Sequence, residues 1–286
     1  MKTQITLKES FLRQHPNYPI IIRRWEESTN TKFTFSNITT YNLKLFKNHL
    51  CSIMSRNGAK TYISKLSSVL NLHADTHKLP YNWKQQLSIK SDASQQIYLT
   101  KQEIAKIHKY KPKTHAENIV KLQFVLGCLT GARRSDYINF TKSNIINNSI
   151  VYCSKKTGIN TSVPATKTTI SIINELDKYS DKEKKFSQVY YNKTLHNICK
   201  SIKLSKPLTL HRNGKTNTLP KYKYITSHTA RRSFATNMYI DNVDIYTISK
   251  MCGHSSVAIT QRYICINGVI THKIKKVFDE YDYMLN

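Results

Sequence analysis

A polar stretch near residue 90 breaks the apolar pattern of this chain in two. The segment SIKSDASQQ, residues 88–96, has no apolar period, whereas periodic apolar residues occur on both sides of it. Directly after it, Thr100 and Glu103 stand at the spacing of a capping box, in which two side chains satisfy free backbone groups at a helix start. We therefore predict two domains joined by a linker. The predicted boundaries are 1–90 for the first domain, 91–99 for the linker and 100–286 for the second domain.

The first segment shows helical periodicity. Apolar residues recur three and four positions apart, with Ser36 as a candidate N-cap, and a second such run follows Gly58. The apolar positions are Leu43, Phe46, Leu50, Ile53, Tyr62, Leu66, Val69 and Leu70. Pro80 ends the pattern. These signals predict a small all-helical module with basic residues on its outer faces.

The second segment mixes helices with a short pair of strands. Residues 118–131 are apolar on most sides, which predicts a buried helix ending at Gly131. Residues 149–154 and 161–165 flank a turn at Gly158, which predicts a β-hairpin. Further helices are expected over 225–240, 244–253, 255–264 and 268–286, and an insertion or lid over 204–224. The fold class is therefore predicted as mainly α with a small antiparallel β-sheet.

Positive charge is the strongest compositional signal. The chain has 45 Lys and Arg against 17 Asp and Glu, a net charge of +28, which is unfavourable through self-repulsion unless a polyanion binds. Nucleic acid is the first candidate, because phosphate contacts dominate its affinity for proteins. An anionic membrane surface is the lesser alternative, since the charge is spread along the whole chain. No apolar run approaches the roughly 18–20 residues that span a membrane, and the N-terminus lacks a signal-peptide core. We expect a cytoplasmic protein with no membrane partner.

Cysteines and acidic residues give no sign of a metal. The six cysteines are scattered, and none forms a C-x-x-C pair or has a histidine at zinc-ligand spacing. We expect no disulfide and no structural zinc. No acidic cluster suits magnesium, so metal-dependent nuclease chemistry fits poorly.

Several basic residues suit chemistry on a phosphodiester. Such a reaction needs a nucleophile, charge for the phosphorane and a proton for the leaving oxygen, and the planar fork of arginine matches two phosphate oxygens. The candidates are the pairs Arg133–Arg134 and His228–Arg231, together with Lys156 and Tyr263. Taken alone, each can also be a solvated or packing residue, since the chain has 18 tyrosines and a large excess of basic residues.

Taken together, four motifs resemble the tyrosine recombinase (phage integrase) family. They are TGARRSDYINF at 130–140, KKTGINTSVPA at 155–165, SHTARRSFATNMY at 227–239 and CGHSSVAITQRY at 252–263. Their order and spacing are similar to those of that family's catalytic domain, which here covers about residues 100–286. The helical module before it resembles the family's core-type, SAM-like DNA-binding domain, with weaker signals. The resemblance implies an all-helical N-terminal domain and a mixed α/β catalytic domain.

The resemblance implies a site-specific recombinase that uses a covalent tyrosine intermediate. Tyr263 would attack a DNA phosphate and form a 3′-phosphotyrosyl link. Arg133 and Arg231 would stabilise the phosphorane, and Lys156 would protonate the departing 5′ oxygen. No cofactor, metal or ATP is implied, because the covalent link conserves the energy of the phosphodiester.

Three further residues receive supporting roles from the same motifs. His228 would act in proton transfer near the nucleophile, His254 would hydrogen-bond a phosphate oxygen, and Asp136 would orient the first catalytic arginine. The chain departs from the common pattern at Arg232, where many members have histidine, and at Cys252, where leucine is common.

The resemblance also implies partners. Double-stranded DNA with specific recombination sites would bind a homotetramer that exchanges strands through a Holliday junction, whereas the free protein would be a monomer. We expect that the free protein does not hold Tyr263 in line beside Arg133 and Arg231. A type IB topoisomerase, a telomere resolvase and a non-catalytic DNA-binding regulator remain the alternatives.

Overall fold

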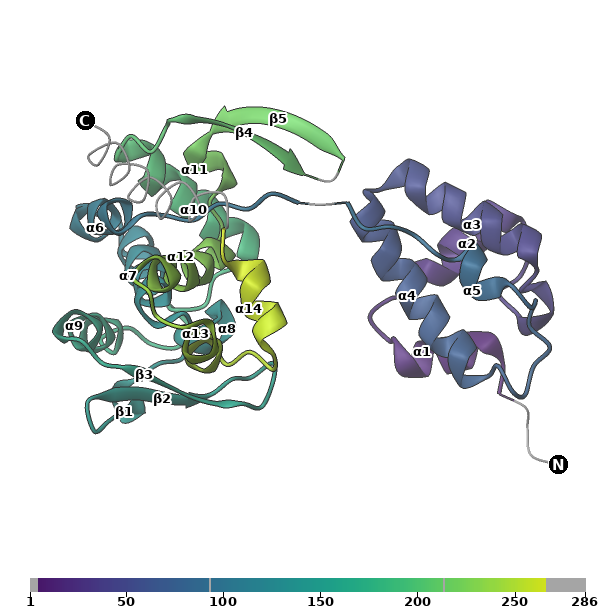
Figure 1. The fold of residues 1–286 in the computed structure, drawn as a ribbon, viewed down its shortest axis with the longest axis horizontal. Helices are drawn as coiled ribbons and strands as arrows, with labels where there is room; N and C mark the ends of the chain where they lie inside the picture. Colours follow the sequence, from purple (N-terminus) through teal and green to yellow (C-terminus); the bar gives the residue numbers. More distant parts are fainter. Residues whose placement is uncertain (1–4, 93, 213, 266–286) are drawn as a thin grey trace, which may run out of the picture. The chain divides into compact units, whose positions relative to one another are not determined.

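The computed structural model describes residues 5–92, 94–212 and 214–265, which group into two compact units (Figure 1). The first unit comprises residues 1–95 and 210–217, and the second comprises 96–209 and 218–286. The helix expected over 268–286 lies outside the described residues. Each unit is described by itself below.

The first unit is made of helices around one apolar core. Its elements are α1 (Leu7–Gln14), α2 (Ile20–Thr29), η1 (Phe35–Asn37), α3 (Thr40–Ile53), α4 (Arg56–Leu72) and α5 (Trp83–Gln86). Trp25 is fully buried, and its ring lies 5.8 Å from that of Phe33 and 5.4 Å from that of Phe46. The predicted helical module is confirmed, because Leu43, Phe46 and Leu50 of α3 pack into this core, but Ile53, the last residue of the predicted stripe, is 43% exposed.

The predicted N-cap of α3 is wrong. Ser36 lies inside the 3₁₀ turn η1, where its hydroxyl meets that of Thr34 at 3.0 Å. The cap is Thr39, whose side chain accepts the backbone N–H of Asn42. A short turn ahead of the helix therefore moves its start three residues along the chain from the predicted position, to Thr39.

The second unit packs helices around the buried helix α7. Its helices are α6 (Lys101–Lys109), α7 (His115–Thr130), α8 (Arg134–Tyr137), α9 (Lys167–Leu176), α10 (Gln188–Ser201), α11 (Lys221–Tyr224), α12 (Ser227–Ile240), α13 (Ile245–Cys252) and α14 (Val257–Tyr263). Helix α7 ends at Gly131, which is left-handed with φ 67°, as predicted. Helix α12 packs on α7 and also contacts α13 and α14 (Figure 1).

The start of the second unit is anchored on α12. Thr100 and Glu103 form the predicted capping box at the start of α6. Just before it, the backbone N–H of Leu99 donates to the Ser233 hydroxyl at 2.8 Å, and the Asn237 amide donates to the Leu99 carbonyl at 3.0 Å. These buried bonds hold the segment entering α6 against α12.

A small antiparallel sheet carries the predicted hairpin. Its strands are β1 (Ile145–Ile146), β2 (Ser149–Cys153) and β3 (Asn160–Pro164), in the order β1-β2-β3. Ile150 pairs with Val163 and Cys153 pairs with Asn160, so the turn between β2 and β3 falls on residues 154–159. The hairpin prediction is confirmed, whereas β1 was not predicted.

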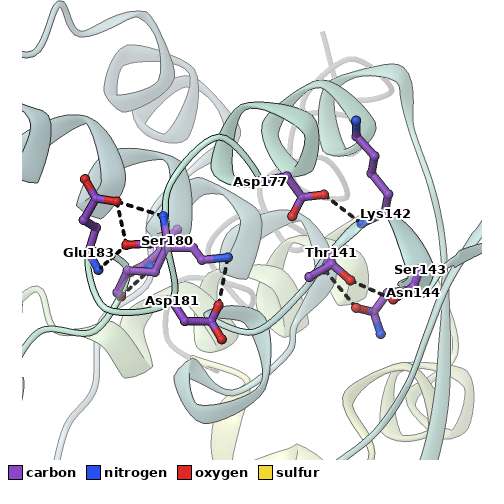
Figure 2. A network of polar contacts seen from close by, with 10 residues as sticks. Thr141, Lys142, Ser143, Asn144, Asp177, Ser180, Asp181 and Glu183 are labelled. Carbon is purple, nitrogen blue, oxygen red and sulfur yellow. Dashed lines mark hydrogen bonds and ion pairs between the residues drawn. The ribbon is translucent and has the colours of Figure 1, made fainter.

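Polar turns hold this sheet beside α9 (Figure 2). The backbone N–H of Lys142 donates to the Asp177 carboxylate at 3.1 Å, which joins the turn before β1 to the end of α9. Thr141 and Asn144 cap the first turn, and Ser180 with Glu183 closes the turn after α9 (Figure 2). The loops around the sheet therefore have their backbone groups satisfied by nearby side chains.

The polar segment at 204–224 forms a hairpin-like insertion. It consists of β4 (Pro207–Arg212) and β5 (Lys215–Pro220), which make a two-stranded sheet, followed by α11. Most of its residues are exposed. An insertion was expected here, but its strand structure was not.

Candidate active site

The turn after α7 places Arg133 at the start of α8. The left-handed Gly131 ends α7, and a Cβ at this position would lie 2.4 Å from the Phe234 ring, so only glycine fits. Arg133 is half-buried, and its Nη1 donates to the Ser154 hydroxyl at 2.8 Å. Burial and the neighbouring charge of Arg231 lower the pKa of the Arg133 guanidinium. The two arginines therefore lie close enough to repel each other.

Asp136 contacts the β2–β3 turn. It is 4% exposed, and its carboxylate accepts the Ser154 hydroxyl at 3.3 Å and the backbone N–H of Lys155 at 3.1 Å. Asp136 was predicted to orient Arg133. In the structure the Ser154 hydroxyl lies between the Asp136 carboxylate and the Arg133 guanidinium and bonds to both.

Arg231 is buried in α12 and has unused donors. Its side chain is 1% exposed, and Nη1 donates to the Gly131 carbonyl at 2.8 Å. Its Nε and Nη2 are buried and have no hydrogen-bond partner among the described residues. A surface pair of His228 and Arg231, the alternative left open by the sequence, is therefore wrong for the arginine. Buried guanidinium donors without partners mark a place where an anion would be stabilised.

Tyr263 ends α14 with its ring against this arginine. The Arg231 guanidinium carbon lies 5.3 Å from the Tyr263 ring centre, and that of Arg232 lies 5.8 Å from it. The ring also lies 4.8 Å from the His254 ring. Tyr263 is thus beside Arg231 in the free protein, but Arg231 is covered. The expectation that the tyrosine is not in line for attack stays a prediction.

His254 follows the left-handed Gly253, which ends α13 as predicted. Its Nδ1 lies 2.9 Å from the Thr260 hydroxyl, and its Nε2 is buried without a partner among the described residues. Burial, followed by the charges of Arg231 and Arg133, lowers the pKa of His254 to about 3. The imidazole is therefore neutral at neutral pH. In the tautomer in which the Thr260 hydroxyl donates to Nδ1, Nε2 carries the proton and can donate it.

His228 and Lys156 lie at the exposed side of the same cluster. Partial desolvation and a group of cations lower the pKa of His228. The cations, in decreasing effect, are Arg232, Arg231, Lys156 and Arg133. Lys156 itself is exposed in the β2–β3 turn. The structure therefore brings all seven residues predicted from the motifs to one region of the second unit.

Arg134 faces a different environment from its neighbour. Its guanidinium donates to the Phe186 carbonyl and to Gln188, and its carbon lies 4.3 Å from the Tyr191 ring centre. These contacts occupy Arg134 in joining α8 to α10. The structure thus distinguishes Arg134 from Arg133, the arginine that the family resemblance selected.

Three residues of the region were not predicted. Ser154 binds Arg133, and Thr260 binds His254. Tyr152 is buried, and burial raises the pKa of its phenol, while the charge of Arg231 opposes the rise. No single-sequence signal marks a serine, a threonine or one tyrosine among many, because their role depends on partners distant in the chain.

Neither a metal cluster nor a membrane span occurs in the part of the chain that the structure describes. No group of three or more His, Cys, Asp or Glu side chains there could hold a metal ion. No helix over those residues is long and apolar enough to cross a membrane. None of the six cysteines, all of which lie within the described residues, forms a disulfide.

Comparison with known proteins identifies the family. The model of the phage integrase family matches residues 97–268, more than half of the chain, which therefore belongs to that family. The tyrosine recombinase XerD of Staphylococcus saprophyticus subsp. saprophyticus is 36% identical over 59 residues, 21% of this chain and 19% of that protein. The match thus spans about a fifth of that relative's length.

Solved structures share the fold. A lambda integrase dimer bound to a COC′ core site has a TM-score of 0.66 at 19% identity, covering 91% of this chain and 95% of that chain. A lambda integrase tetramer bound to a Holliday junction has a TM-score of 0.62 at 18% identity, covering 92% and 78%. At these identities the likeness establishes the mainly α fold with its small antiparallel sheets.

Proposed function

We propose that this chain is a site-specific DNA recombinase that breaks and rejoins DNA through Tyr263. The observation that carries the proposal is the buried Arg231 guanidinium, whose Nε and Nη2 have no partner among the described residues and whose carbon lies 5.3 Å from the Tyr263 ring centre. A tyrosine beside a cation with spare N–H groups is suited to attack on a bound phosphate. Membership of the phage integrase family supports the same activity.

The phosphate would be held by donors from three elements. Arg133 comes from the start of α8, Arg231 from α12, and His254 from the turn before α14. Two guanidinium groups spread positive charge over the non-bridging oxygens, and the protonated Nε2 of His254 adds a neutral donor. Because Arg231 is 1% exposed, side chains packed on it, among them the Tyr263 ring, would have to move for a phosphate to reach it.

The cleavage step conserves protons and bonds. The Tyr263 oxygen forms a bond to phosphorus as the bond from phosphorus to the 5′ oxygen breaks, which leaves a 3′-phosphotyrosyl link. His228, whose lowered pKa keeps it neutral near pH 7, accepts the phenol proton. Lys156 donates a proton to the 5′ oxygen. Rejoining is the reverse reaction with a new 5′-hydroxyl, so the sequence needs no ATP.

Arginines supply the charge that metal ions supply in other phosphoryl-transfer sites. Burial and the neighbouring charge of Arg231 lower the pKa of the Arg133 guanidinium, so the two cations lie close together. A phosphate between them relieves this repulsion. We propose on this basis that cleavage proceeds without an added metal ion or cofactor.

The partner would be double-stranded DNA, bound by a homotetramer. The net charge of +28 favours a polyanion, and the relatives include a lambda integrase tetramer bound to a Holliday junction. We extend that assembly to this chain, with a monomer in the absence of DNA. The first unit would serve as the core-type DNA-binding domain.

A plasmid assay tests the activity. The substrate is a supercoiled plasmid carrying two copies of the DNA that flanks the chain's own gene, incubated with EDTA and without ATP. Recombinant products that depend on both copies are expected. Relaxation without recombinants would instead indicate a topoisomerase-like enzyme, and DNA binding with no strand cleavage would indicate a regulator.

A further inference from the structure

We propose that Ser154 is a positioning residue, which holds Arg133 in place for the phosphate. The inference rests on the function proposed above. Ser154 directly follows β2 and is 1% exposed. Its hydroxyl, its backbone N–H and its backbone carbonyl all form hydrogen bonds.

The Ser154 hydroxyl joins a cation to an anion. A guanidinium can only donate and a carboxylate can only accept. The hydroxyl oxygen therefore accepts from Arg133 Nη1 at 2.8 Å, and its single proton goes to Asp136 Oδ2 at 3.3 Å. One side chain thus completes a relay from Asp136 to Arg133. The buried carboxylate polarises the hydroxyl, which strengthens its bond to the arginine.

The Ser154 backbone closes the turn that carries Lys156. Its N–H donates to the Ile159 carbonyl at 2.9 Å, and its own carbonyl accepts the N–H groups of Thr157 at 3.2 Å and Gly158 at 2.8 Å. Asp136 also accepts the neighbouring N–H of Lys155 at 3.1 Å. The turn is therefore held both by its own backbone and by Asp136, so that loss of the hydroxyl alone leaves most of these bonds.

Arg133 needs such an anchor because it faces another cation. The charge of Arg231 lies close enough to lower the pKa of Arg133, so the two guanidinium groups repel each other before DNA arrives. Arg231 is fixed by the Gly131 carbonyl at 2.8 Å. Without the Ser154 hydroxyl, the half-buried Arg133 loses this hydrogen-bond acceptor and can rotate away from Arg231. The phosphate would then meet one positioned arginine in place of two.

The test compares Ser154→Ala with Ser154→Thr in single-turnover cleavage. The substrate is a nicked suicide DNA, in which the short strand that ends in the released 5′-hydroxyl diffuses away and traps the adduct. We expect Ser154→Ala to lower the cleavage rate about 10- to 100-fold, in line with the effect of a misplaced catalytic group, with little change in DNA affinity. Ser154→Thr keeps the hydroxyl and should recover most of the rate.

A second substrate separates the effects on Arg133 and on Lys156. In it, sulfur replaces the bridging 5′ oxygen, and a thiolate leaves without a proton. Lys156→Ala should therefore regain activity on this DNA, whereas Ser154→Ala should stay slow because its defect lies in charge stabilisation. Recovery of Ser154→Ala by sulfur would overturn the assignment to Arg133.

A matched variant controls for the loss of a buried hydroxyl. Thr169 is 1% exposed in α9, and Thr169→Val should lower the melting temperature without lowering the cleavage rate below that temperature. Equal cleavage rates for wild type and Ser154→Ala would contradict this inference alone. Absence of any adduct with wild type would instead contradict the proposed function.

Discussion

Tyr263 lies with its ring against the guanidinium of Arg231, 5.3 Å from the guanidinium carbon to the ring centre. The two residues come from α14 and α12, and the arginine is 1% exposed. A cation against an aromatic face is attracted by about 0.5–2 kcal/mol, more when desolvated. The ring therefore lies against the arginine that a phosphate would use, and we expect DNA binding to change the contacts of Arg231.

Replacing Arg231 by lysine should remove most cleavage. Lysine keeps the charge but offers a point charge in place of the planar fork, which here donates to the Gly131 carbonyl through Nη1 and leaves Nε and Nη2 for a phosphate. We expect the single-turnover rate to fall about 10²- to 10³-fold. Arg262→Lys, at an exposed position of α14, is the control. A rate for Arg231→Lys within a few-fold of wild type would count against the site.

Replacing Arg133 should affect mainly the cleavage rate, whereas replacing Arg134 should affect mainly the free energy of unfolding. Arg134→Ala loses two hydrogen bonds and the contact with the Tyr191 ring, and should lower the free energy of unfolding by roughly 1–3 kcal/mol. Arg133→Ala should leave unfolding nearly unchanged and abolish most cleavage. Chemical denaturation and adduct formation measure the two effects. The reverse pattern would assign the catalytic role to Arg134.

Gly253→Ala should destabilise the turn that holds His254. Gly253 has φ 61°, which costs other residues roughly 1–2 kcal/mol, and a Cβ there would lie 2.6 Å from the Thr161 hydroxyl. Gly158 has φ 64° but nothing within 4 Å, so Gly158→Ala carries only the conformational cost. Thermal unfolding should therefore show a larger loss for Gly253→Ala. Equal losses would show that the contact with Thr161 yields without strain.

His254 should make the fold sensitive to acid. Its folded-state pKa of about 3 lies below the ordinary value of 6.5, so below pH 6.5 the unfolded chain binds a proton that the folded chain does not. Its contribution to stability is full above pH 6.5 and is lost as the pH falls toward 3, by at most about 1.4 kcal/mol per pH unit. His254→Gln should flatten this dependence, measured by denaturation between pH 7 and 4. His211→Gln, at an exposed position, should not.

Local sequence signals predicted the turns well where one residue type decides the geometry. Gly131 and Gly253 both end helices in the left-handed conformation that glycine adopts without strain. Strand β1 was not predicted from the sequence, although Asn147 and Asn148 form the turn between β1 and β2. Both have positive φ, 45° and 58°, as the tight turn of a hairpin requires. The Asn147–Asn148 pair could therefore have predicted this hairpin from the sequence.

The environment of the site could not be predicted in the same way. Arginine is seldom fully buried, so nothing local indicated that Arg231 is 1% exposed while His228, three residues before it, is exposed. The motifs predicted which residues meet, but the roles of Ser154 and Thr260 depend on bonds to distant elements. Ser36 failed as a cap because a 3₁₀ turn left the helix to begin at Thr39.

The most direct measurement is the identity of the residue joined to DNA. Wild type, Tyr263→Phe and Tyr152→Phe are each incubated with the nicked suicide DNA, and the covalent product is digested and mapped by mass spectrometry. Tyr152 is a matched control, because it lies near the charge of Arg231 but burial raises the pKa of its phenol. We predict a phosphotyrosyl peptide at Tyr263 for wild type and Tyr152→Phe, and no adduct for Tyr263→Phe. An adduct that persists in Tyr263→Phe, or one that maps to another residue, would contradict the account.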